Sequence, residues 1–107
     1  MTQEVELTIK LVALWSTPKD VDGFEKDYEE THIALVAALP GLQGAVASKA
    51  LDGPYHRMAE LMFENGDGLQ NALGSEGGQK LLADSGRLQE TYGTKLDVLI
   101  VEEQVRI

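Results

Sequence analysis

The first and last apolar segments of the chain restrict its fold most, because both are strand-like and apolar on two sides. Residues 7–15 (LTIKLVALW) place five alternating apolar side chains on one face, and Val12 and Leu14 make the other face apolar as well. Residues 95–107 (KLDVLIVEEQVRI) are apolar on both sides over residues 98–101. Such strands must be covered on both faces. The chain is therefore expected to form a sheet with packing partners on each side.

An amphipathic helix is predicted over residues 21–39. At about 100° per residue, its apolar stripe consists of Val21, Phe24, Tyr28, Thr31, Leu35 and Leu39. His32 falls at the edge of that stripe, one turn after Tyr28. Asp20 is the expected N-cap. Pro40 and Gly41 end the helix, since proline cannot continue it and glycine accepts left-handed geometry.

The remaining segments complete a βαββαβ order. We expect a weak second strand over residues 43–51, a third over residues 57–64, and helices near residues 68–73 and 76–92. This order predicts one α+β domain over residues 1–107 with a ferredoxin-like fold, in which a four-stranded antiparallel sheet carries its helices on one face. The other face would then be left apolar and bare. We therefore expect a homodimer through the sheet faces.

Composition excludes several classes of protein and site. The 107 residues include no cysteine, which removes thiolate catalysis, disulfides and cysteine-ligated metals. A net charge of −9 disfavours nucleic acid and anionic membranes as partners. The acidic N-terminus does not resemble a signal peptide, and the longest apolar run is too short to cross a bilayer. Two histidines and no cysteine make a poor metal shell, so we expect no metal, and no cofactor is expected either. The absence of cysteine suits a cytoplasmic protein.

The motif F-x-x-x-Y-x-x-T-H-x-x-L-x-x-x-L-P-G-L over residues 24–42 resembles the EthD family. The matching residues are Phe24, Tyr28, Thr31, His32, Leu35, Leu39, Pro40, Gly41 and Leu42. The resemblance implies ferredoxin-like subunits that dimerise into an α+β barrel. The family takes its name from a gene cluster for ethyl tert-butyl ether degradation, where it accompanies a monooxygenase system. Relatives with the dimeric barrel include cofactor-free monooxygenases, muconolactone isomerases, and cyclases or dehydratases, so the resemblance leaves the reaction open.

His32 and Tyr28 are the candidate catalytic residues. A neutral imidazole between helix and sheet can take a proton from a carbon acid or a phenol, and Tyr28 can donate a hydrogen bond to a developing oxyanion. The alternative is that His32 is a packed residue with one satisfied nitrogen. The candidate substrate-binding residues are Trp15, Phe24, Leu35, Met62 and Tyr92, each of which could equally be a core or dimer contact.

Two further polar residues have no assigned role. Glu60 lies between Met58 and Met62, where it is either an acid with a raised pKa or an exposed side chain. His56 lies in a turn, where an exposed ring is expected.

The sequence thus supports two hypotheses. In the first, the chain is a cofactor-free enzyme of oxygenase, isomerase or dehydratase type, acting on a small apolar or aromatic metabolite with His32 as the acid or base. In the second, it is a non-catalytic dimeric carrier or accessory protein for a hydrophobic metabolite in a degradation pathway.

Overall fold

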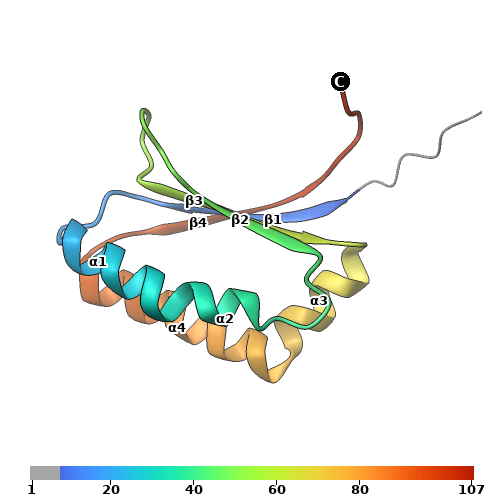
Figure 1. Ribbon diagram of the computed structural model, residues 1–107, viewed down its shortest axis with the longest axis horizontal. Helices are drawn as coiled ribbons and strands as arrows, with labels where there is room; N and C mark the ends of the chain where they lie inside the picture. Colours follow the sequence, from blue (N-terminus) through green and yellow to red (C-terminus); the bar gives the residue numbers. More distant parts are fainter. Residues whose placement is uncertain (1–7) are drawn as a thin grey trace, which may run out of the picture.

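A computed structural model describes residues 8–107 and has the predicted order of strands and helices (Figure 1). One sheet lies over a layer of helices, and η1 is a π-helical turn within the first helix. The elements are β1 (Ile9–Trp15), α1 (Val21–Asp27), η1 (Tyr28–His32), α2 (Ile33–Ala37), β2 (Gly44–Lys49), β3 (Arg57–Phe63), α3 (Gly66–Gly74), α4 (Glu76–Tyr92) and β4 (Leu96–Glu102).

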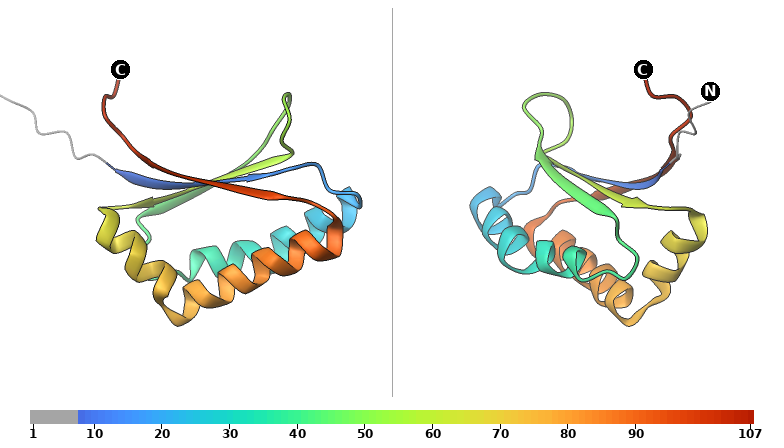
Figure 2. Two further views of the ribbon diagram at one scale, coloured as in Figure 1. Left: turned by 180° about the vertical axis from the view of Figure 1, so that it is seen from behind. Right: turned by 45° about the vertical axis from the view of Figure 1, so that its right-hand side comes forward.

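The sheet has the order β2-β3-β1-β4, and every neighbouring pair is antiparallel. All the helices lie on one face of it, as two further views make clear (Figure 2). This arrangement confirms the predicted ferredoxin-like fold. The last strand is shorter than expected, since β4 ends at Glu102, and the predicted start of the first strand at Leu7 lies outside the described residues.

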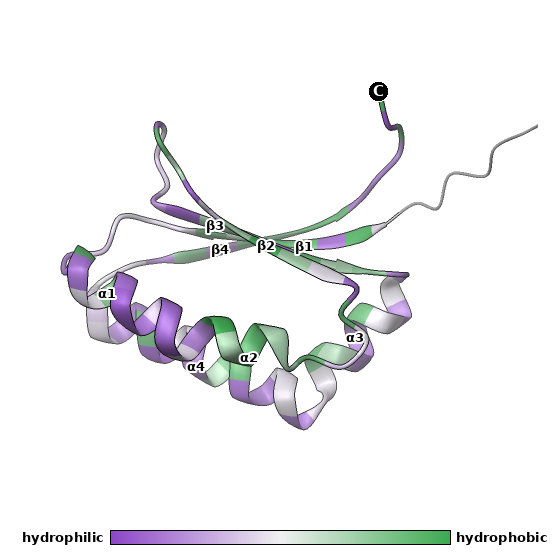
Figure 3. Cartoon of the chain, viewed as in Figure 1, coloured by the Kyte–Doolittle hydropathy of each residue, from purple (hydrophilic) through white to green (hydrophobic). Residues whose placement is uncertain are grey.

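The face of the sheet that meets the helices carries two buried clusters. The larger contains Ala59, Leu61 and Phe63 of β3, which alternate inward as their spacing predicts. The smaller is mainly aromatic and consists of Trp15, Phe24, Tyr28 and Leu88. In Figure 3, α2 is mainly apolar, whereas α1 is mainly hydrophilic. The aromatic cluster is the part of the core that surrounds the predicted site.

Local signals explain where the helices begin and end. Asp20 caps α1 as predicted, because its side chain accepts a hydrogen bond from the backbone N–H of Gly23 at 3.0 Å. Ser75 separates α3 from α4 and caps α4 through the N–H of Gly78. Gly78 is required there, because an added Cβ would clash with the carbonyl oxygens that end α3. The glycines of this region therefore mark a break between two helices.

The opposite face of the sheet is uncovered in the single chain. Its apolar side chains are Val12, Leu14, Val46, Met58, Met62, Leu99 and Val101. Leu99 is 53% exposed, which is unusual for a central position on a strand. Glu60 lies among these residues and forms an ion pair with Lys10 at 3.7 Å. Glu60 and Lys10 therefore form an ion pair on a face that also carries Ser48 and Asp97 among its apolar side chains.

Candidate functional site

The π-helical turn decides which residues of the first helix are buried. In η1 the backbone N–H of Ile33 bonds to the carbonyl of Tyr28, five residues earlier. A π turn holds one residue more than an α turn, so the side chains that follow it are displaced around the axis. The buried positions are consequently Phe24, Tyr28, His32 and Val36. The prediction of Val21 and Thr31 as stripe residues is wrong, because both are exposed, whereas Leu35 is half-buried and packs against the core as predicted.

Three aromatic rings fix the position of the His32 imidazole. Tyr28 is stacked between Phe24 and His32, with ring centroids 5.4 Å away on each side. Trp15 meets the imidazole edge-on at 5.5 Å and 89°. All four residues are at most 5% exposed. Because these rings come from β1 and the first helix, the imidazole is held between two elements and has little freedom to reorient.

His32 is paired with a buried carboxylate on the neighbouring helix. Its Nδ1 lies 2.9 Å from Oδ2 of Asp84 on α4. A carboxylate can only accept, so Nδ1 carries the proton and Nε2 keeps its lone pair. Within residues 8–107, no side chain or backbone group hydrogen-bonds to Nε2. Burial lowers the pKa of His32, and the hydrogen bond to Asp84 opposes that effect in part. The ring is therefore a neutral base near pH 7.

Asp84 is itself held by a guanidinium that bridges two helices. Arg87 donates from Nε to Oδ1 of Asp84 at 2.8 Å, and from both terminal nitrogens to Asp27 of α1 at 2.7 Å. Tyr92 also donates its hydroxyl to Asp27, at 2.7 Å. Arg87, with Tyr92, holds the pKa of Asp27 far below its usual range. These contacts form a continuous hydrogen-bonded chain from the surface to the His32 ring.

The second histidine has a different environment from the exposed turn that was predicted. His56 is half-buried, and its Nε2 lies 3.0 Å from Oε1 of Glu25. Arg57 donates to the other oxygen of Glu25 at 2.9 Å and lies over the Tyr28 ring at 5.2 Å. The prediction was wrong because α1 covers the turn with an acidic residue. His56 belongs to an ion-paired rim beside the aromatic cluster.

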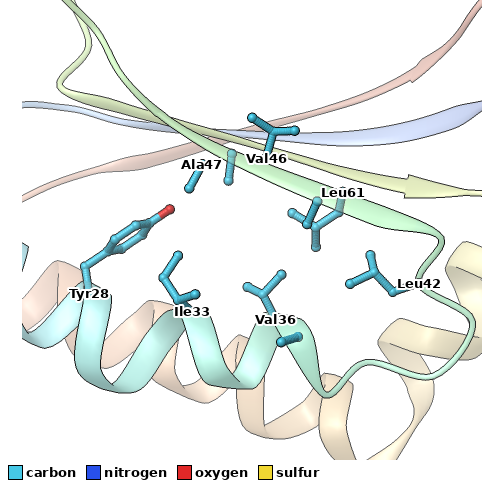
Figure 4. A pocket seen from close by; sticks show the side chains of 10 residues that line it. Tyr28, Ile33, Val36, Leu42, Val46, Ala47 and Leu61 are labelled. Carbon is cyan, nitrogen blue, oxygen red and sulfur yellow. The ribbon is translucent and has the colours of Figure 1, made fainter.

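A cavity of about 330 Å³ lies between α2 and β2. Figure 4 shows Ile33, Val36 and the hydroxyl of Tyr28 directed toward the strand across this space. Among the described residues that line the cavity, Tyr28 alone has a polar side chain. Burial raises the pKa of Tyr28, against a smaller opposing effect of Arg57, so the phenol stays protonated and can donate. No described residue hydrogen-bonds to that hydroxyl.

His32 lines a second, smaller cavity of about 60 Å³ on the other side of Tyr28. For comparison, a protein cavity that binds benzene measures about 150 Å³. The larger cavity therefore has room for a small aromatic molecule, and the smaller one does not. The two are separated by side chains that line both, namely Tyr28, Val36, Ala59 and Leu61. The imidazole opens onto hollow space, yet that space is not the larger cavity.

The predicted substrate-binding residues lie in several different places. Trp15 and Phe24 are in the aromatic cluster beside His32. Leu35 packs against the larger core cluster, and Tyr92 is bonded to Asp27. Met62 lies on the opposite face of the sheet, paired with Lys10, and lines neither cavity. The structure thus brings Trp15 and Phe24 to the catalytic candidates and separates Met62 from them.

The pairing of His32 with Asp84, and of Asp84 with Arg87, was not predicted. A signal was nevertheless present, because Asp84 shares a helical face with Leu81, Ser85 and Leu88. A carboxylate on a buried stripe requires a partner. The described residues contain no cluster of three or more side chains suited to a metal ion. They also contain no helix that is both long and apolar enough to span a membrane.

Comparison with known proteins identifies the family. The EthD domain model matches residues 17–91. The chain belongs to the EthD family. An EthD family protein from Bacillus halodurans C-125 is 25% identical, with a TM-score of 0.83 over 91% of this chain and 99% of that one. The match extends the resemblance of residues 24–42 across the second helix.

More distant structures share the fold of this EthD chain. SnoaB, a cofactor-independent oxygenase from Streptomyces nogalater, is 12% identical, with a TM-score of 0.70 over 94% of this chain and 96% of its own. A dimeric protein of unknown function from Bacteroides fragilis NCTC 9343 is 12% identical, with a TM-score of 0.64 over 92% of this chain and 96% of its own. At this identity they indicate the fold alone. No curated protein sequence matches the chain significantly.

Proposed function

We propose that this EthD protein is a cofactor-free enzyme that removes a proton from a small apolar or aromatic molecule, with His32 as the base. The observation that carries the proposal is the buried His32–Asp84 pair, at 2.9 Å, on a ring that borders a cavity. The proton moves from a carbon acid or a phenol to Nε2, and its electron pair stays on the substrate as an enolate or phenolate. Asp84 stabilises the imidazolium that results. Oxygenation, isomerisation and dehydration can each begin with this step.

Tyr28 is the proposed contact for the substrate's oxygen. Tyr28 lines both cavities and its hydroxyl faces the larger one, so it is the residue that a ligand there would meet on the way to His32. A phenol that stays protonated donates to an oxygen on which negative charge develops. We therefore propose that the body of the substrate occupies the larger cavity and that its reacting end points past Tyr28 toward His32. The fold is shared with SnoaB, which is a cofactor-independent oxygenase.

The second candidate is a non-catalytic carrier of a hydrophobic metabolite. One observation favours it, namely that the cavity large enough for an aromatic ligand does not include His32 among its lining residues. In this case Tyr28 would orient the ligand and His32 would contribute only to packing and hydrogen bonding. The two candidates share a ligand site and differ in whether the ligand changes.

We further propose a homodimer through the uncovered face of the sheet. A patch of half-buried and exposed apolar side chains on a strand face is a liability in a monomer. A two-fold axis would bury the same residues of each copy and cover both faces of β1, as its sequence requires. The Bacteroides fragilis protein of the same fold is described as dimeric.

Two measurements on one set of ligands separate enzyme from carrier. The wild-type protein is incubated in D₂O under air with small phenols, aromatic ketones and lactones, and mass spectrometry follows deuterium uptake and any new product. Binding of the same compounds is measured by calorimetry. The His32→Gln variant keeps a polar side chain of similar length without a base. We expect it to lose deuterium uptake and product formation, and to keep binding.

The other outcomes decide against one or both candidates. Binding without a change of mass for any compound, in wild type and variant alike, would support the carrier. A reaction that proceeds equally fast in His32→Gln would refute His32 as the base. Absence of binding by every compound would mean that the larger cavity is a packing defect and not a ligand site.

A further inference from the structure

We propose that Arg87 is a positioning residue that fixes the proton on Nδ1 of His32 and keeps the imidazole uncharged, by holding Asp84 on one side and Asp27 on the other. The catalytic meaning of this inference rests on the proposed function. Arg87 touches neither cavity, since it is absent from both linings. It acts through Asp84 and is not itself a catalytic residue.

Geometry gives Arg87 control over the orientation of Asp84. The two oxygens of Asp84 have different partners, because Oδ1 accepts from Arg87 Nε at 2.8 Å and Oδ2 accepts from His32 Nδ1 at 2.9 Å. If Arg87 is removed, the carboxylate can turn about its bond to the rest of the side chain, and Oδ2 is no longer directed at the ring. The tautomer of His32 is set by this bond.

Asp27 in turn keeps Arg87 in place. Two parallel hydrogen bonds of 2.7 Å join the guanidinium to Asp27, which is the bidentate geometry that favours arginine over lysine. Asp27 is the last residue of α1, directly before the π turn that carries His32. The bridge therefore ties the start of the π turn to α4. The base and its partner carboxylate are held at a fixed separation.

The charges around His32 predict that its pKa shifts in opposite directions when Arg87 and Asp27 are replaced. The titratable and charged groups that face the ring are Asp84 and Arg87 of α4, Asp27 of α1 and Tyr28 of η1, whereas β1 contributes the uncharged Trp15. Arg87 disfavours the imidazolium, and Asp27 and Asp84 favour it. Loss of Arg87 leaves two carboxylates uncompensated beside the ring. Loss of the Asp27 charge removes one of the groups that stabilise the imidazolium.

The chain has only two histidines, which makes a direct test practical. Proton and nitrogen NMR spectra report the titration midpoint and the tautomer of each ring, and a His56→Gln variant assigns the His32 signals. We expect Arg87→Gln to move the His32 midpoint to higher pH and to give a mixture of tautomers. Asp27→Asn keeps one side-chain oxygen that can accept from Arg87 but loses the negative charge, so we expect it to move the midpoint to lower pH. Arg87→Lys keeps the positive charge but cannot make the two parallel hydrogen bonds to Asp27. Its His32 midpoint should lie closer to that of the wild type than the midpoint of Arg87→Gln does.

Opposite shifts of the His32 midpoint in Arg87→Gln and Asp27→Asn distinguish a positioning role of Arg87 from simple loosening of the fold. Loosening exposes the ring and moves its pKa up toward the ordinary value of 6.5 in every variant, because burial is what lowers it. A rise in Asp27→Asn, or an unchanged midpoint and tautomer in Arg87→Gln, would therefore overturn the inference. If Arg87→Gln does not fold, Asp27→Asn and Arg87→Lys give the decision. These spectra need no ligand, so the inference and the proposed function fail independently.

Discussion

Replacing Tyr28 by phenylalanine removes a hydroxyl that is the proposed contact for a ligand oxygen and that has no hydrogen-bond partner within the described fold. The hydroxyl faces the larger cavity and has no hydrogen-bond partner among the described residues, whereas the ring is stacked on two sides. Phenylalanine keeps that stacking. We therefore expect Tyr28→Phe to fold as the wild type does and to bind a ligand oxygen less tightly.

The expected magnitudes follow from the hydrogen bonds made and lost. A hydroxyl without a protein partner adds nothing to the folded state, so the free energy of unfolding should change by less than about 0.5 kcal/mol. A ligand oxygen that accepts from Tyr28 gains about 0.5–1.5 kcal/mol, which corresponds to a loss of roughly two- to tenfold in affinity when the hydroxyl is removed.

A pair of matched ligands isolates that hydrogen bond. Naphthalene and 1-naphthol differ by one hydroxyl, and calorimetry gives their dissociation constants for wild type and Tyr28→Phe. We expect the preference for 1-naphthol to disappear in the variant while naphthalene binds equally well to both proteins. Urea unfolding of the same samples measures stability. Tyr92→Phe is the control, because its hydroxyl donates to Asp27 at 2.7 Å and should matter for stability but not for binding.

Two results would refute this reasoning. If Tyr28→Phe lowers stability more than Tyr92→Phe does, the Tyr28 hydroxyl has a structural partner and is not free for a ligand. If the preference for 1-naphthol is the same in Tyr28→Phe and wild type, the ligand oxygen binds elsewhere, and Tyr28 loses its proposed role.

Three further predictions test the packing, the charges and the assembly. Gly78→Ala should lower the free energy of unfolding in urea by about 1–3 kcal/mol, because the added Cβ meets backbone oxygens of α3. Gly86→Ala has open space and should raise the free energy of unfolding by up to about 1 kcal/mol. The lowered pKa of Asp27 stabilises the fold above about pH 4 and this contribution is lost as the pH falls, so the acid-induced loss of stability should be shallower in Asp27→Asn. Leu99→Lys should convert the proposed dimer to a monomer in sedimentation, whereas Leu82→Lys, which is about equally exposed on the helix side, should not. A monomeric wild type would refute the proposed dimer.

Alternation alone predicted the strands and which of their side chains share a face, but not which face meets the helices. On β3, Ala59, Leu61 and Phe63 point to the helices and Met58 and Met62 away from them, as a period of two requires. That alternation also showed which strands need cover on both sides. Met62 was predicted to bind substrate, but it lies on the face of the sheet opposite the helices. It therefore cannot line a cavity on the helix side.

Contacts between segments far apart in the sequence could not be predicted from it. His32 and Asp84 are 52 positions apart, and Asp27 and Arg87 are 60 apart, so no local pattern pairs them. His56 was predicted to be exposed because its neighbours form a turn, and Glu25 of another element provides its partner. Polar partners of this kind depend on how the helices lie against each other, and that arrangement is set by the packing of the whole core.

The burial of His32 depends on a feature that helical periodicity cannot reveal. A constant 100° per residue puts His32 at the edge of the stripe and Thr31 inside it, and the π turn reverses that order. π turns are rare, and they occur frequently at functional sites. Here the turn moves an imidazole from the helix edge to a position beside Asp84, Trp15 and a cavity. The proposed ligand site accounts for that departure from a regular helix, because Thr31 and Leu35 could have completed an ordinary stripe without it.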